Sequence, residues 1–125
     1  MALPQQKRTI LIVDDEDLIR DLLADALSDD FNILTAPNGE DALRVFEQYG
    51  DEISLVITDL IMPLMRGDVL AEKLRKLRPA LPIVFISGHE REIQLSTLLA
   101  KGNTAFLPKP FDVENLTATL QTILV

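Results

Sequence analysis

The chain contains short, continuous apolar runs separated by longer stretches in which apolar residues recur every three or four positions. Apolar runs of about four to eight residues, rich in β-branched side chains and bounded by polar ones, are typical of parallel strands buried on both faces. They predict strands at 10–13, 31–35, 53–58, 83–86 and 104–107. The third predicted strand ends directly at Asp59, so a carboxylate follows a buried segment.

The stretches between these runs have the spacing of amphipathic helices. They predict helices over about 18–28, 42–50, 70–78, 90–101 and 113–123. Gly50 and Gly102 stand where helices are expected to end, and Asp112 stands where its carboxylate can cap the last helix. Five strands alternating with five helices at short spacing indicate an α/β fold with a doubly wound parallel sheet.

Polar residues follow several of the predicted strands at the point where each strand ends. In an open α/β sheet, functional sites form beyond the carboxyl ends of the strands. The residues that this rule brings to one edge are Asp14, Asp15, Asp59, Ser87 and Lys109. Their convergence is the main argument, from the residues alone, for a functional site.

Length and composition agree with one soluble domain. The 125 residues are 47% hydrophobic and 26% charged, so we expect a single domain over 1–125 with a core of about 7–124. The net charge of −8 argues against direct binding of nucleic acid.

The absence of cysteine excludes disulfides and thiolate metal sites. We expect a cytoplasmic protein without membrane insertion, because no apolar run approaches transmembrane length and residues 1–6 lack the core of a signal peptide.

Three carboxylates at one sheet edge need a positive partner. Without cysteine, a hard, oxygen-preferring cation such as Mg²⁺ is the candidate cofactor. Lys109 supplies a positive charge and Ser87 a hydroxyl group, and both suit phosphoryl oxygens. A carboxylate beside such groups can itself attack phosphorus and form an acyl phosphate.

Simpler roles account for several neighbouring residues. Glu16 and Asp17 are interpreted as acidic residues that favour the first turn of the following helix. His89 is interpreted as a loop residue, while Met62 and Met65 are interpreted as packing residues.

The segments 10–15, 59–67, 87–88 and 109–111 together resemble the receiver domain of two-component response regulators, and the resemblance extends from about 7 to 124. It implies a flavodoxin/CheY-like three-layer sandwich with strand order 2-1-3-4-5. It also implies that Asp59 accepts a phosphoryl group from a histidine kinase or a histidine phosphotransfer protein.

The resemblance assigns further roles residue by residue. It implies that Asp14, Asp15, Asp59 and the main-chain carbonyl of Ile61 hold Mg²⁺. Ser87 and Lys109 would contact the phosphoryl oxygens, and the peptide bond between Lys109 and Pro110 would be cis. Ser87 and Phe106 would form the conformational switch, with phenylalanine in place of the family's usual tyrosine. Ile61 and His89 occupy positions that tune dephosphorylation in relatives.

The resemblance also implies a signalling phosphoacceptor domain that catalyses only its own phosphorylation and dephosphorylation. Its downstream partner would be a protein or a fused domain. Its expected state is a monomer or a weak, phosphorylation-dependent dimer. The segments 81–89 and 107–111 are similar to receivers fused to hybrid sensor kinases.

Three other classes of protein share parts of this pattern. A phosphatase or phosphotransferase of the haloacid dehalogenase type also uses an aspartate nucleophile, and Asp15 with Asp17 superficially fits its motif, but that family normally needs a longer chain. A toprim-like nuclease domain shares an acidic sheet edge, but the chain's net negative charge and the Lys109 motif fit that class poorly. A receiver that serves only as a binding module would be expected to lack Asp59, an acidic-pair residue or Lys109, and all are present.

Overall fold

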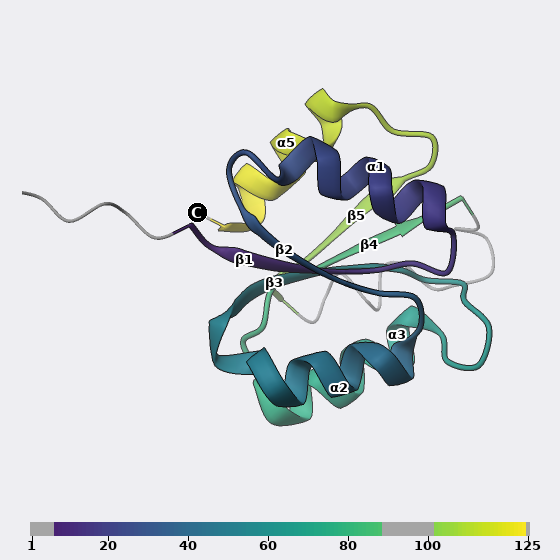
Figure 1. Cartoon of the computed structure of the whole chain (residues 1–125), viewed down its shortest axis with the longest axis vertical. Coiled ribbons are helices and arrows are strands. Elements are labelled where there is room, and N and C mark those ends of the chain that lie inside the picture. Colours follow the sequence, from purple (N-terminus) through teal and green to yellow (C-terminus); the bar gives the residue numbers. More distant parts are fainter. Residues whose placement is uncertain (1–6, 89–101, 125) are drawn as a thin grey trace, which may run out of the picture.

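A computed structural model describes residues 7–88 and 102–124 of the chain. Its five strands form one parallel sheet in the order β2-β1-β3-β4-β5 (Figure 1). The described elements are β1 (Thr9–Val13), α1 (Asp17–Leu27), β2 (Asn32–Ala36), α2 (Gly39–Tyr49), the short 3-10 helix η1 (Gly50–Glu52), β3 (Ile53–Asp59), α3 (Gly67–Leu77), β4 (Ile83–Ser87), β5 (Thr104–Pro108) and α5 (Val113–Leu124). The predicted fold class and strand order are confirmed.

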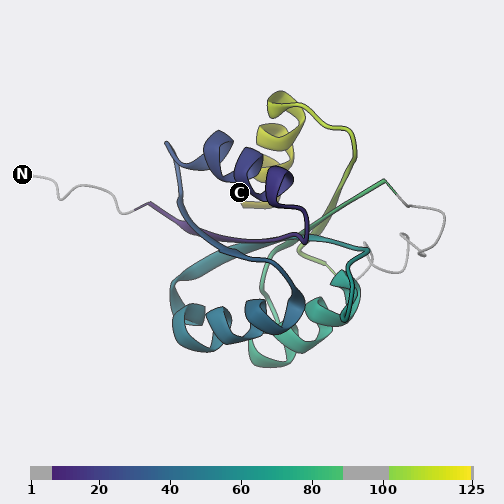
Figure 2. The ribbon, with the colours of Figure 1, turned by 45° about the vertical axis from the view of Figure 1, so that its right-hand side comes forward.

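Helices cover both faces of the sheet and complete a three-layer arrangement. Helices α1 and α5 lie on one face, and α2 and α3 lie on the other (Figures 1 and 2). Alternate residues of β1 serve the two layers: Ile10 and Ile12 join the core under α1 and α5, whereas Leu11 and Val13 join the core over α2 and α3. This double burial explains why β1 and β3 are continuous apolar runs and not alternating ones.

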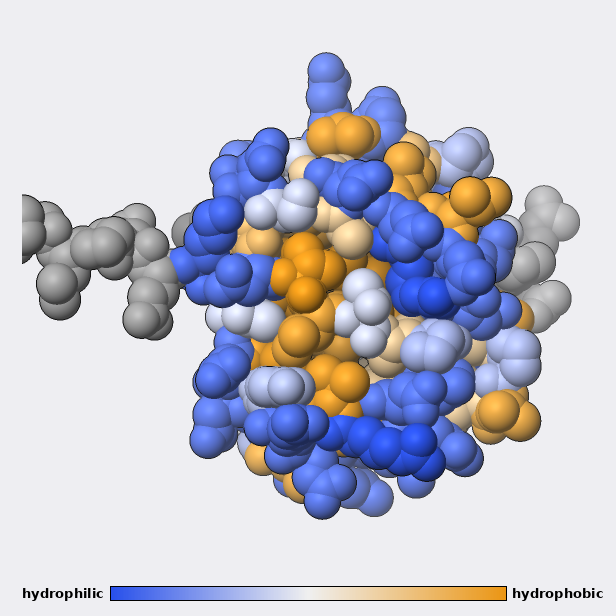
Figure 3. Space-filling view, in the orientation of Figure 1, coloured by the Kyte–Doolittle hydropathy of each residue, from blue (hydrophilic) through white to orange (hydrophobic). Residues whose placement is uncertain are grey.

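The β2 edge of the sheet is only partly covered. Ile33 and Leu34 of β2 are half-buried and pack against opposite core clusters. Figure 3 shows hydrophobic side chains reaching the surface along the middle of this face, between two mostly hydrophilic helical layers. None of the helices within 7–88 and 102–124 is long and apolar enough to cross a bilayer.

Element boundaries differ from the predictions by one to three residues, and the largest differences are the starts of α2 and α3, which lie three residues earlier than predicted, at Gly39 and Gly67. The second strand is shifted by one residue, from 31–35 to Asn32–Ala36, because Phe31 packs under α1 and its N–H donates to the carbonyl of Leu27. The predicted cap is confirmed, since Asp112 Oδ1 accepts from the N–H of Asn115 at 2.8 Å. Gly102 has a positive φ of 74°, but the helix predicted over 90–101 lies outside the described residues.

Arg78 ties the end of α3 to the start of β3. Its guanidinium donates to the carbonyl oxygens of Gly50, at 2.5 Å, and Ile53, and it lies 5.7 Å from the centroid of the Phe46 ring. Because these charged hydrogen bonds and the ring contact are lost together, Arg78→Met should lower the free energy of unfolding by about 2 kcal/mol. Urea denaturation measures the change.

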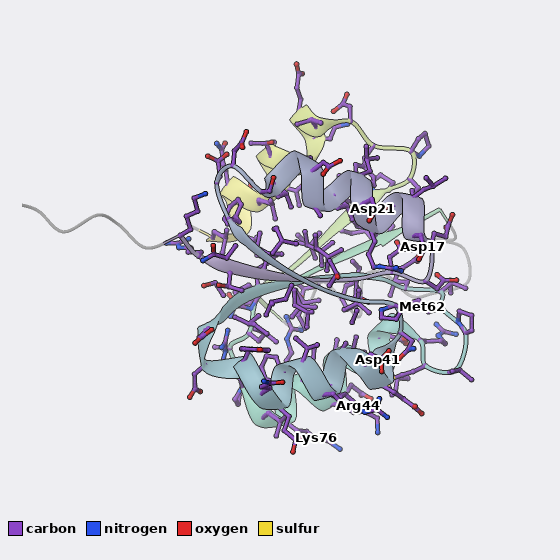
Figure 4. All side chains as sticks on the ribbon, in the orientation of Figure 1. Asp17, Asp21, Asp41, Arg44, Met62 and Lys76 are labelled. Atoms are coloured by element: carbon purple, nitrogen blue, oxygen red, sulfur yellow. The ribbon has the colours of Figure 1, made fainter. Side chains whose placement is uncertain are left out.

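Lys76→Met is the matched control for this prediction. Lys76 is exposed in the last turn of α3, two residues before Arg78 (Figure 4), so its replacement should change the free energy of unfolding by no more than about 0.5 kcal/mol. Equal effects of the two substitutions would contradict the role assigned to Arg78.

Candidate functional site

Three carboxylates meet at the carboxyl edge of the sheet. Asp14 and Asp15 directly follow β1, and Asp59 is the last residue of β3. One carboxylate oxygen from each of the three lies within 4.8 Å of the others. Asp14 is 1% exposed and Asp59 is 5% exposed, whereas Asp15 is exposed. The sheet therefore brings together the acidic residues that the sequence placed at one edge.

Lys109 extends into this acidic group from the loop after β5. Its Nζ lies 2.8 Å from Oδ2 of Asp59, 3.6 Å from Oδ2 of Asp14 and 3.5 Å from Oε1 of Glu16. Burial by itself acts to lower the pKa of Lys109, but the hydrogen bond with Asp59 and the three carboxylate charges outweigh it and raise the pKa. The ammonium therefore stays protonated through the neutral pH range. The peptide bond between Lys109 and Pro110 is cis.

The carboxylate of Asp59 is held from two sides. Oδ2 accepts the hydrogen bond from Lys109, and Oδ1 accepts one from the main-chain N–H of Ile61 at 3.1 Å. The loop after β3 then folds back, and the N–H of Gly67 donates to the carbonyl of Leu60 at 2.8 Å. Strand β3 and its loop thus fix the position of Asp59 before any ligand arrives.

Asp14 is held by the backbone around it. Its N–H donates to the carbonyl of Ala36 at 3.2 Å, and its Oδ1 accepts from the N–H of Glu16 at 2.9 Å. Burial raises the pKa of Asp14, and the charges of Asp59 and Asp15 act in the same direction, against the Glu16 hydrogen bond and Lys109. An ionised Asp14 is therefore costly unless further positive charge is supplied.

The donor set fits a hard cation. Within the described ranges, three carboxylates face one ammonium group, so negative charge is in excess. Three oxygen ligands of which two are buried suit an ion that takes a few carboxylates and keeps several waters. These three residues are therefore grouped so that they could hold a metal ion.

Glu16 belongs to this site, although the sequence assigned it only to a helix terminus. It is the residue before α1 and makes no side-chain capping hydrogen bond; its carboxylate instead approaches Lys109. The interpretation was correct for Asp17, which opens α1 and forms an ion pair with Arg20. Figure 4 shows Asp17 and Asp21 on α1. The acidic run alone contains no signal that separates Glu16 from Asp17.

The two residues of the expected switch lie on the same half of the sheet. Ser87 is the last residue of β4 and pairs in register with Pro108, so its backbone lies at the carboxyl edge. Phe106 lies in β5, half-buried, and packs against the core cluster under α2 and α3. Their switching role remains a prediction. His89 lies outside the described residues.

The methionines near the site are packing residues, as predicted. Met62 is 6% exposed and belongs to the core (Figure 4). Met65 packs against the same cluster, close to Gly39 at the start of α2.

Comparisons with known proteins point to one family. The family model described as "Response regulator receiver domain" matches residues 10–121. The chain is 36% identical over 117 residues to "Sensor kinase CckA" of Brucella abortus, which covers 93% of this chain and 12% of that protein. It is 36% identical over 123 residues to "Probable transcriptional regulator ycf27" of Cyanidium caldarium, which covers 96% of this chain and 48% of that protein. The chain thus spans from about a tenth to half of the length of these relatives.

The solved structures that resemble this chain include receiver-domain and chemotaxis proteins. The receiver domain of the hybrid histidine kinase CckA has a TM-score of 0.79 at 35% identity, over 94% of this chain and 99% of that chain. The chemotaxis protein CheY4 of Vibrio cholerae has a TM-score of 0.84 at 28% identity, over 95% of this chain and all 100% of that chain.

Proposed function

The chain belongs to the response regulator receiver family of two-component systems, and from that membership we propose that Asp59 is its phosphoacceptor. The observation that carries the proposal is the position of Asp59. Its carboxylate ends the central strand β3, beside two further carboxylates and 2.8 Å from a protonated lysine. Membership of this family argues against the haloacid dehalogenase-type and toprim-like alternatives.

The donor would be a phosphohistidine of a histidine kinase or of a phosphotransfer protein. A carboxylate oxygen of Asp59 attacks phosphorus, a P–O bond forms and the P–N bond to the imidazole breaks. The bonding pair stays on the imidazole nitrogen, which takes up a proton from solvent. Asp59 becomes an acyl phosphate, and Lys109 and Ser87 are proposed to bind the phosphoryl oxygens.

Asp14, Asp15, Asp59 and the main-chain carbonyl of Ile61 are proposed to hold Mg²⁺. When bound, this ion would offset the negative charge of the carboxylates and of the incoming phosphoryl group. The grouping of three carboxylate oxygens supports this assignment. The chain's own contribution is to hold these oxygens in place and to keep Lys109 charged.

Phosphorylation would place new negative charge and acceptor oxygens at the end of β3. We propose that Ser87 moves toward them and that Phe106 changes its packing, so that the β4–β5 side of the domain signals to a downstream protein or fused domain. Since Phe106 has no hydroxyl group, this coupling would act through packing. The domain would work in the cytoplasm as a monomer or a weak, phosphorylation-dependent dimer. Its similarity to sensor kinases supports the proposal that it is the receiver of a hybrid sensor kinase.

Intact-mass spectrometry after incubation with Mg²⁺ and acetyl phosphate tests the acceptor. The wild-type chain should gain one phosphoryl group, and Asp59→Asn should gain none. Asp51→Asn is the matched control, since it makes the same chemical change at an exposed position in η1 and should leave the adduct intact.

Two outcomes would overturn the proposal. An adduct that persists in Asp59→Asn would place the phosphoryl group on another residue. A wild-type chain that neither gains the phosphoryl group nor binds beryllofluoride would be a binding module with an unused acidic site.

A further inference from the structure

Arg20 reaches from α1 back to the loop that carries the acidic pair. Its Nη1 donates a hydrogen bond to the main-chain oxygen of Asp14 at 2.7 Å. Its Nη2 forms an ion pair with Oδ1 of Asp17, and only 17% of the side chain is exposed. The guanidinium group is thus mostly buried and bonded to the main-chain oxygen of a proposed metal ligand.

This bond completes the restraint of Asp14. The N–H and the carboxylate of Asp14 are held by Ala36 and Glu16, and Arg20 holds the carbonyl oxygen. The carbonyl belongs to the peptide plane that joins Asp14 to Asp15. Fixing its direction therefore also fixes where the backbone of Asp15 begins.

The acidic group needs such a restraint. Carboxylate oxygens of Asp14, Asp15 and Asp59 lie within 4.8 Å of one another, and like charges at this range repel. Repulsion favours an outward swing of the exposed Asp15, whose loop lies beyond the end of β1. Ligands that are held in place before the ion arrives bind it more tightly than ligands that must first be ordered.

We propose that Arg20 is a positioning residue of the cation site, which anchors the peptide plane between Asp14 and Asp15 so that both carboxylates face Asp59. The inference rests on the proposed function, in which these carboxylates hold Mg²⁺.

The direction in which the Mg²⁺ affinity changes when Arg20 is replaced distinguishes a positioning role from an electrostatic one. A guanidinium near the site repels a cation, so a purely electrostatic role predicts that removing Arg20 raises the affinity for Mg²⁺. Asp17 already offsets part of that charge. Positioning predicts the opposite change, a lower affinity.

The test compares Arg20→Met, Arg20→Lys and a control, Arg44→Met. Arg44 makes an ion pair with Asp41 at 2.9 Å and at the same i,i+3 spacing, but on α2 (Figure 4). It therefore controls for the loss of a helical Asp–Arg pair. Mg²⁺ dissociation constants are measured by isothermal titration calorimetry on the full chain, at a temperature where circular dichroism shows every variant folded.

Arg20→Met should raise the Mg²⁺ dissociation constant about tenfold, a change in the range found when a partner of a metal ligand is lost. Arg20→Lys keeps the positive charge but has a single ammonium group in place of the two guanidinium nitrogens that bond Asp14 and Asp17, so its dissociation constant should fall between those of the wild type and Arg20→Met. Arg44→Met should stay within about twofold of the wild type. The main-chain N–H of Glu16 donates a hydrogen bond to the carboxylate of Asp14. In the metal-free protein, Arg20→Met should therefore also increase the rate of hydrogen exchange at this N–H.

Phosphorylation kinetics supply a second readout. With acetyl phosphate, the Arg20→Met variant should be phosphorylated more slowly than the wild type at low Mg²⁺ and at nearly the wild-type rate at saturating Mg²⁺. The reason is that positioning changes the binding of the ion and not the chemical step. An unchanged or lower dissociation constant in Arg20→Met, with a wild type that binds normally, overturns the role of Arg20 alone. A wild type that takes up neither Mg²⁺ nor a phosphoryl group overturns the proposed function and this inference together.

Discussion

Gly67→Ala should destabilise the protein by about 3 kcal/mol. A Cβ atom on Gly67 would lie 2.1 Å from the carbonyl oxygen of Asp59 and 3.0 Å from the Cα of Leu60. Both neighbours are backbone atoms, so no side chain can rotate away to make room. Gly67 is the first residue of α3, where alanine has a higher helix propensity than glycine. A loss of stability in Gly67→Ala would therefore be due to the close approach of Gly67 to the backbone of Asp59 and Leu60.

Urea denaturation measures this loss, with Gly88→Ala as the control. A Cβ atom on Gly88 would meet its nearest neighbours, in Lys109, at 3.8 and 3.9 Å, which is ordinary contact. Its replacement should change the free energy of unfolding by no more than about 0.5 kcal/mol. If Gly67→Ala were as stable as the wild type, the loop after β3 would not be fixed against Asp59 as described.

Much of this site could be predicted because it depends on topology. Buried strands produce continuous apolar runs, and parallel strands bring their carboxyl ends to one edge. Those two rules are enough to bring Asp14, Asp15, Asp59 and Lys109 to one edge of the sheet from the sequence alone, and the structure has them there. Both rules concern the path of the backbone, which the pattern of apolar and polar residues predicts well.

The contacts that sequence reasoning missed depend on side-chain direction. Glu16 looked like a helix-terminus residue because any acidic residue there has the same local advantage. Arg20 was not among the residues selected from the sequence, because its bond to the carbonyl of Asp14 depends on the angle between the helix and the loop. The one-residue shift of β2 has the same origin, since tertiary packing of Phe31 decides the boundary.

Asp14→Asn should make the protein more stable than the wild type at pH 7 when Mg²⁺ is removed with a chelator. Burial raises the pKa of Asp14 above its ordinary value of 3.8, so the ionised side chain opposes folding at neutral pH. The asparagine removes this charge, and its side-chain oxygen can still accept from the N–H of Glu16. Lys109 keeps Asp59 and Glu16 as partners.

The pH dependence has a definite sign. A carboxyl group with a raised folded-state pKa stabilises the fold below its unfolded pKa and loses that contribution as the pH rises through the folded pKa. The advantage of Asp14→Asn over the wild type should therefore shrink as the pH falls from 7 toward 3.8. Urea midpoints across this range measure it.

Mg²⁺ should reverse the order of stability. At a free concentration one hundred times the dissociation constant, a ligand that binds only the folded state stabilises it by about 2.7 kcal/mol. The wild type should gain this amount, and Asp14→Asn should gain far less because it lacks a buried ligand. Asp51→Asn, remote from the site, should gain as much as the wild type. Equal gains in wild type and Asp14→Asn would mean that the ion binds without Asp14, and the acidic pair would then lose its proposed role.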